Sequence, residues 1–191
     1  MQSSIRQKHL DFVKDVIIEG SKKNLLGEGF LVPLSFIISY NDDVHIVPAD
    51  FTEVSKEDYA QIIRQLSHKY CAVGVVFVSE AYKYDKDQVK KLGIDKIKDQ
   101  LERYRESHSE FVLKDNPYCK EVIHIIEEYT DGVYSTSIPI ERSRQGEITF
   151  GKQEESFGIS EDYSGIMTNM IGKPDIEELL ETIIKKKGEN K

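Results

Sequence analysis

Two carboxylates and a lysine come closest to a recognisable chemistry. Asp50 and Glu80 are each expected where an apolar strand ends, on either side of one helix, and Lys83 follows Glu80. In metal-dependent nucleases carboxylates hold Mg²⁺ and a lysine steadies the attacking water or the leaving charge. The spacing is unfavourable, because residues three apart point to opposite faces of a strand. A divalent-metal hydrolase or nuclease with these low-ranking candidates is therefore an alternative and not the leading hypothesis.

The other common signatures of catalysis are absent from the sequence. It has no GxSxG elbow, no GxxxxGK[ST] phosphate loop, no GxGxxG fingerprint and no HExxH pair. Cys71 and Cys119 form no CxxC pair, which excludes a cysteine zinc cluster. His124 lies in the middle of an apolar strand, where an interior histidine is expected. We predict no catalytic residue, no bound metal and no cofactor, and lean against an enzyme.

The stretch VGVVFVSEAYKY (73–84) raises the question whether its polar end is a chemical site. We interpret it as a solvated strand end that begins after Ser79, with Glu80 at the surface. The chain has ten tyrosines and no tryptophan. Tyrosine is favoured at binding surfaces because it offers a large rigid ring with a polar tip. Tyr82, Tyr84 and Tyr104 are therefore the candidate binding residues.

Composition narrows the class of partner. The chain has 191 residues, 39% hydrophobic and 31% charged, which suits one domain with its own core. With a net charge of −8, the chain lacks the positive electrostatic field that drives nucleic-acid binding. No apolar stretch is long enough to span a membrane, and charges interrupt the N-terminal segment. We expect a cytoplasmic protein with a protein partner, no nucleic acid and no membrane; a homo-oligomer stays open.

Apolar periodicity predicts the elements of the first half. A helix is expected from Ser4 to Glu19, ended by Gly20 and followed by a loop. Strands over 30–40 and 44–51 form a hairpin, and Pro33 suggests an edge position or a bulge. A second helix starts at Ser55, with Asp58 completing a weak capping box. The uninterrupted apolar run 72–79 predicts a strand covered on both faces.

The second half is expected to add a helical excursion and further strands. Residues 85–107 are mostly charged and predict a solvated helical excursion. Asp131-Gly132 predicts a hairpin between strands 122–129 and 133–140, and 148–152 is a candidate last strand. Residues 153–173 are expected to be irregular and 174–187 helical. The predicted fold is a single α+β domain, with helices on one face of a mostly antiparallel sheet of five to six strands.

A core is predicted from the same pattern. It comprises the following residues: Phe36, Ile38, Ile62, Leu66, Val75, Phe77, Ile123 and Ile125.

Three segments carry a resemblance. IVPADF, VVFVSEAY and EVIHIIEEYTDG are similar to segments of uncharacterised proteins from bacteria and phages, which usually have tryptophan where this chain has Tyr82. The resemblance implies one compact α/β domain and a prokaryotic or phage setting, and assigns no activity. The leading hypothesis is a non-enzymatic binding protein, an accessory factor that acts on another protein. A small-molecule-binding module with a pocket above the sheet is a second alternative.

Overall fold

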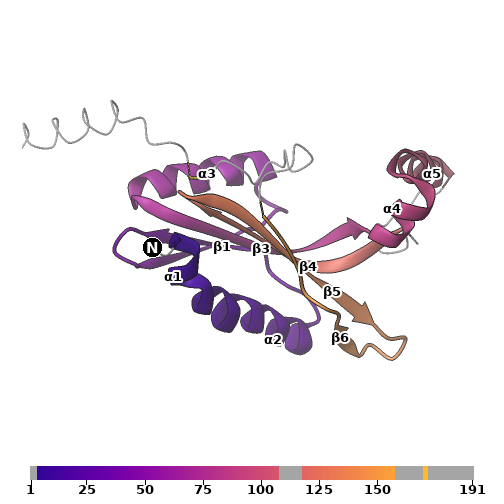
Figure 1. Cartoon of the computed structure of the whole chain (residues 1–191), viewed down its shortest axis with the longest axis horizontal. Helices are drawn as coiled ribbons and strands as arrows, with labels where there is room; N and C mark the ends of the chain where they lie inside the picture. Colours follow the sequence, from indigo (N-terminus) through magenta and orange to yellow (C-terminus); the bar gives the residue numbers. More distant parts are fainter. Residues whose placement is uncertain (1–3, 108–117, 158–169, 172–191) are drawn as a thin grey trace, which may run out of the picture.

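The chain folds around one antiparallel sheet. The computed structural model describes residues 4–107, 118–157 and 170–171. Its seven strands follow the order β2-β1-β3-β4-β5-β6, and β7 pairs with β5 (Figure 1). Every strand pair is antiparallel, which confirms the predicted α+β class. The bounds are β1 (Leu34–Ser39), β2 (Val44–Pro48), β3 (Ala72–Tyr84), β4 (Cys119–Tyr129), β5 (Gly132–Arg142), β6 (Ile148–Phe150) and β7 (Glu154–Phe157).

The N-terminal helical stretch is longer than predicted. It consists of α1 (Ile5–Asp11), the π-helical η1 (Phe12–Ile18) and α2 (Glu19–Glu28) without a break. Ser4 caps its start by accepting the Gln7 N–H at 3.2 Å. The prediction that Gly20 ends the helix was wrong: the helix continues until Gly29, whose φ of 80° is left-handed. Leu25 is fully buried beyond Gly20, so packing outweighs the low helix propensity of glycine.

Helices cover both faces of the sheet, whereas one face was expected. Figure 1 shows α3 (Lys56–Lys69) on one side and α1, η1 and α2 on the other. Alternate residues of β1 serve the two layers: Phe36 packs with the N-terminal helices, and Ile37 packs with α3. The unbroken apolar runs of β1 and β3 require this double cover.

Helix α3 begins as predicted, but it is rotated about its own axis, so that the buried side differs slightly from the predicted one. Ser55 accepts the Asp58 N–H at 3.1 Å and donates to the Asp58 carboxylate at 2.7 Å. Ile63 is fully buried, but Ile62, a predicted core residue, is 40% exposed. Leu66, also predicted to be core, is only partly buried at the margin. The remaining predicted core residues are buried.

The later elements follow the predicted order with shifted bounds. The hairpin at Asp131-Gly132 joins β4 and β5 as expected. The excursion forms α4 (Lys86–Leu92) and α5 (Ile94–Ser107), which lie beyond the ends of β3 and β4 in Figure 1. Strand β7 occupies the start of the stretch predicted to be irregular. The rest of that stretch, apart from residues 170–171, and the predicted helix 174–187 lie outside the described residues.

Two prolines define the β1–β2 hairpin differently from the prediction. Pro33 precedes β1, which lies inside the sheet between β2 and β3, so Pro33 marks neither an edge nor a bulge. Its carbonyl accepts the Ala49 N–H at 2.9 Å. Pro48 instead lies on β2, which forms the edge of the described sheet.

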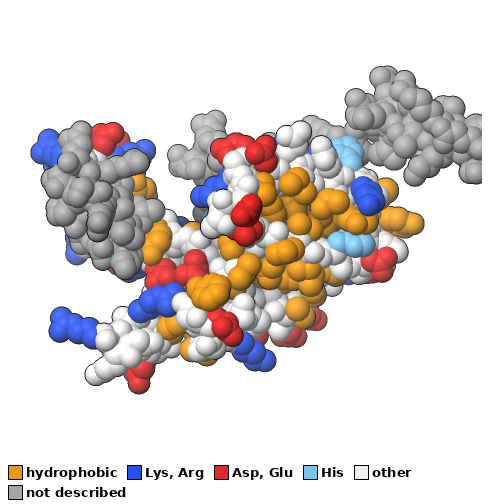
Figure 2. Space-filling view, turned by 180° about the vertical axis from the view of Figure 1, so that it is seen from behind, with side chains coloured by type: hydrophobic (Ala, Val, Ile, Leu, Met, Phe, Trp, Pro, Cys, Tyr) orange, Lys and Arg blue, Asp and Glu red, His pale blue; other side chains and the backbone are white. Residues whose placement is uncertain are grey.

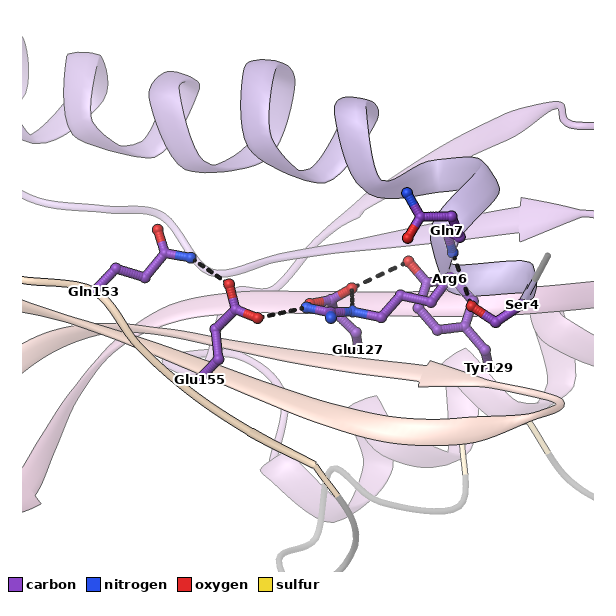
Figure 3. A network of polar contacts seen from close by, with 7 residues as sticks. All are labelled: Ser4, Arg6, Gln7, Glu127, Tyr129, Gln153 and Glu155. Carbon is purple, nitrogen blue, oxygen red and sulfur yellow. Dashed lines mark hydrogen bonds and ion pairs between the residues drawn. The ribbon is translucent and has the colours of Figure 1, made fainter.

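A buried ion pair fixes α1 to the sheet. Glu127 of β4 has no exposed side-chain surface and binds both Arg6 Nε, at 3.1 Å, and Arg6 Nη2, at 3.0 Å (Figure 3). Arg6 lies over the Tyr134 ring, with Cζ 4.2 Å from the centroid, and its Nη2 also binds exposed Glu155. Tyr129 donates its hydroxyl to Glu127 at 3.3 Å. The Glu127 carboxylate therefore has the partners that a buried charge requires.

Replacing Phe77 by alanine should lower the free energy of unfolding by about 3–5 kcal/mol, because a buried aromatic side chain is deleted. Phe77 is 6% exposed against the α3 layer. Chemical denaturation measures the change. Ile62→Ala is the control and should cost less than Phe77→Ala, since Ile62 is 40% exposed and loses fewer buried contacts. A loss below about 1 kcal/mol for Phe77→Ala would show that this layer is not packed as described.

Arg6→Ala should cost about 3–5 kcal/mol, because it leaves the Glu127 carboxylate buried without its cation. A double variant, Arg6→Met with Glu127→Met, should recover most of that loss, since neither charge is then buried. Glu155→Ala is the control, because Glu155 is exposed and contributes a weak surface pair. Equal losses for Arg6→Ala and Glu155→Ala in urea melts would contradict a structural role for the buried pair.

Candidate binding surfaces

Glu80 lies inside a strand and not at its end. Strand β3 pairs with β4 as far as Tyr84 opposite Cys119, and Glu80 lies opposite Ile123. The predicted strand end at Ser79 was therefore wrong. Because β3 continues beyond Ser79 and residues two apart share a face, Glu80 and Tyr82 both lie on the face covered by α2.

Glu80 belongs to a three-residue polar cluster. Arg142 of β5 forms two bonds of 2.9 Å with Glu121 of β4 and one of 3.3 Å with Glu80. Its Nη1 donates to the carbonyl of Gly29 at 2.8 Å. Glu80 also accepts the N–H of Leu31. The cluster therefore fastens the chain between α2 and β1 to the sheet.

Glu80 and Glu121 both bind Arg142, but their pKa values shift in opposite directions. Burial, reinforced by the nearby Glu121, raises the pKa of Glu80. The Arg142 guanidinium and the hydrogen bond with Glu80 lower the pKa of Glu121 despite its burial. Glu121 is the principal anion and Glu80 the group that holds its proton more tightly. The described hydrogen bonds of the cluster all join groups of this chain to one another. The cluster therefore has a structural role.

Lys83 faces away from Glu80, as the spacing predicted. Its Nζ donates to the hydroxyl of Ser137 at 3.1 Å, on the α3 side of the sheet. On the same side, Nε2 of His124 lies 2.9 Å from the Ser135 hydroxyl. Burial, reinforced by Lys83, lowers the pKa of His124 to about 4, so the ring is neutral at pH 7.

Asp50 and Glu80 have no common partner among the described residues. The Asp50 carboxylate accepts the Thr52 N–H at 3.0 Å and its hydroxyl at 2.6 Å, closing a turn after β2. Among residues 4–107, 118–157 and 170–171, no group of three His, Cys, Asp or Glu side chains could hold a metal ion. The hydrolase alternative thus gains no geometric support from Asp50, Glu80 and Lys83.

Two of the candidate tyrosines, Tyr82 and Tyr84, line an open groove and a neighbouring pocket. Tyr82 is 37% exposed and lines a groove of about 870 Å³ together with Cys119, Arg142 and Lys152. Tyr84 is half-buried in a smaller neighbouring pocket, and burial raises its pKa. The side chain of Tyr104 lies outside the described residues. The groove wall is mixed in charge, because Glu121 and Glu154 line it together with Arg142 and Lys152.

Sequence reasoning missed a second surface, along β2. Val44, Ile46 and Pro48 are exposed and share one face, beside Ile38, Phe36 and Leu34 of β1. Ile46 is 61% exposed. Figure 2 shows hydrophobic side chains gathered on this side of the molecule, away from β5 and β6. We call Val44, Ile46, Pro48 and the outer backbone of β2 the β2 edge surface; its signal in the sequence was the apolar residue at every second position of VHIVP, from Val44 to Pro48.

The outer backbone of β2 has no strand beside it in the described part of the chain. Bonds from Ala49 N–H to Pro33 and from Ser39 N–H to Asp43 show that odd-numbered residues of β2 face β1. Antiparallel pairing alternates, so the N–H and C=O of Val44 and Ile46 point outward. Pro48, which has no N–H, occupies the third outward position.

The comparisons with known proteins add no relative. No family model, no curated protein sequence and no solved structure matches the chain. Of the helices in the described segments, none has the length and apolar character needed to cross a membrane.

Glu80→Ala should cost about 1–3 kcal/mol, because the N–H of Leu31 then loses its acceptor. Glu80→Gln should cost less, since its amide oxygen accepts that N–H and its NH₂ can donate to Glu121. Urea melts of both variants measure the difference. A cost within about 0.5 kcal/mol for Glu80→Ala would restore the interpretation of Glu80 as an ordinary surface residue.

The pH dependence of the same variants gives a separate prediction. A carboxyl with a raised pKa binds its proton more tightly in the folded state, and that stabilisation is lost as pH rises through the folded pKa. Glutamine stays neutral throughout. The stability of Glu80→Gln relative to the wild type should therefore increase between about pH 4 and pH 7. A constant difference across this window would contradict the assigned direction of the Glu80 pKa.

Proposed function

We propose that the protein is a non-enzymatic binding module that recognises another protein through the β2 edge surface. The observation that carries the proposal is the coincidence of exposed apolar side chains and outward backbone groups on one strand. Contiguous apolar patches on a protein surface mark interaction sites when they are large. An exposed strand edge also offers donors and acceptors that a partner can pair with.

The remaining polar groups support a structural and not a catalytic role. The Arg142 cluster joins α2 to the sheet, and the Arg6–Glu127 pair joins α1 to it. Asp50 closes a turn. The proposal includes a cytoplasmic setting in a bacterium or its phage, where the protein acts as an accessory factor; it rests on the composition and on the resemblance around Tyr82.

The groove at Tyr82 favours one second candidate function, a small-molecule-binding module. Its volume of about 870 Å³ falls in the range of ligand pockets. Its mixed charge and open form select no ligand class. A thermal-shift screen with nucleotides and metal ions tests it: a rise in melting temperature that Tyr82→Ala removes would favour this function over the β2 edge surface.

Ile46→Glu should abolish capture of the protein partner while leaving stability within about 0.5 kcal/mol, because Ile46 is largely exposed. The tagged full-length protein and the variant are compared by pull-down from host extract with quantitative mass spectrometry. Leu26→Glu is the matched control, since Leu26 is 59% exposed on α2 and away from β2. A set of captured proteins that is unchanged by Ile46→Glu would overturn the proposed function.

A further inference from the structure

We infer that the segment bound at the β2 edge surface is an extended peptide with alternating apolar residues and a Lys or Arg at each end, which adds to the sheet beside β2. This inference rests on the proposed function and names the chemistry of the partner. The backbone of β2, the order of its side chains and the charges at its two ends support it separately.

The backbone of β2 is prepared for a further strand. Val44 and Ile46 direct both N–H and C=O outward, and the intervening residues are held by β1. On the α3 side, the His45 ring stacks on Tyr70 with centroids 3.7 Å apart, and Tyr59 donates to the Val47 carbonyl at 2.8 Å. These contacts fix the twist and position of β2, so a peptide would meet an ordered edge.

The side chains favour an alternating partner. Val44, Ile46 and Pro48 lie on one face, and a paired strand places every second side chain beside them. Strand β2 has no Lys, Arg, Asp or Glu, which are the residues that commonly protect an edge from pairing. Recognition by strand addition uses the backbone for affinity and alternate side chains for specificity.

Acidic residues lie at both ends of β2. Asp43 precedes the strand and Asp50 follows it. Asp43 accepts from the Asn41 amide at 2.7 Å, and Asp50 accepts from Thr52. No Lys, Arg or His forms an ion pair with either of these carboxylates within the described residues. The hydrogen bonds from Thr52 lower the pKa of Asp50, which keeps it charged. A peptide with a cation at each end complements this pattern.

Asp50 and a neighbouring acid, Asp42, disfavour a second copy of the chain as the occupant. Two β2 strands paired about a two-fold axis at Ile46 would place Asp42 of one copy, which binds Lys8 of its own chain at 2.7 Å, opposite Asp50 of the other copy. Like charges directly opposite destabilise a strand pair. Pro48 would also face Val44 and leave one carbonyl of that pair without a donor. A basic-ended peptide avoids the charge repulsion, although its carbonyl opposite Pro48 also meets no donor.

The test uses four labelled peptides and the full-length protein, with binding measured by fluorescence anisotropy. The first peptide is Lys-Thr-Val-Thr-Val-Thr-Val-Lys, and the second has Glu at both ends. The third and fourth peptides keep the basic ends and carry N-methyl groups on alternate residues. One blocks the first edge of the strand and the other blocks the second edge. The first peptide should bind at least about tenfold more tightly than the second, as expected for two weak ion pairs. The N-methyl version that blocks the edge paired with β2 should lose binding.

Variants tie binding to the site. Ile46→Glu should abolish binding of the basic peptide, and Leu26→Glu should leave it unchanged. The double variant Asp43→Asn with Asp50→Asn keeps the hydrogen-bond acceptors but removes both charges, so the preference for basic ends should disappear. Raising the salt concentration should reduce the same preference in the wild type.

The outcomes separate this inference from the proposed function. Equal affinity for basic and acidic peptides, tight binding of both N-methyl versions, or no binding of the basic peptide would overturn the inference. The proposed function would still stand if Ile46→Glu abolished capture of the host partner. A concentration-dependent dimer in sedimentation that Ile46→Glu dissolves would also overturn the inference and assign the surface to a second copy.

Discussion

The burial of two adjacent carboxylates at the end of β4 constrains the rest of the structure. Glu127 and Glu128 point to opposite faces of the sheet, and both are buried. Glu127 binds Arg6, which is 121 positions away in the sequence, and thereby fixes the N-terminal helices on one face. Glu128 accepts the N–H groups of Met170 and Ile171 on the other face, at 2.9 and 3.1 Å. An unpaired charge in either place would cost several kcal/mol, so both distant segments are required.

A second guanidinium acts at the other end of the N-terminal helical stretch. Arg142 binds the carbonyl of Gly29, where α2 ends, and Glu80 binds the next segment at Leu31. The helical stretch is therefore held at its start by Arg6 and at its end by Arg142. The apolar residues of this stretch cover one face of β1, β3, β4 and β5. On the same face of the sheet, Ile46 of β2 remains exposed. The exposed apolar face of β2 therefore lies beyond the area that the helices cover in the positions set by Arg6 and Arg142.

Local signals in the sequence predicted the local structure well. Asp131-Gly132 and Ser55 act within a few residues, and the structure contains the hairpin and the helix cap that they predicted. Gly20 was misinterpreted because the burial of Leu25 is a tertiary effect. The role of Glu80 was equally hidden, since its partners Leu31 and Arg142 lie far away in the sequence. The clearest unused signal was the pair of acids in IIEEY, because charges within an apolar strand need distant partners.

The proposed role of the β2 edge surface requires protection from aggregation as well as selectivity for a partner. An apolar edge strand is an aggregation hazard, and proteins limit it with proline and with charges. Here Pro48 removes one outward N–H, and Asp43 and Asp50 lie just beyond the strand, so the apolar centre between them remains open. Acids in these positions repel the acidic ends of another copy but do not repel a basic segment. Specificity of this kind needs both an attractive and a repulsive element. The proposal places both in the eight residues from Asp43 to Asp50.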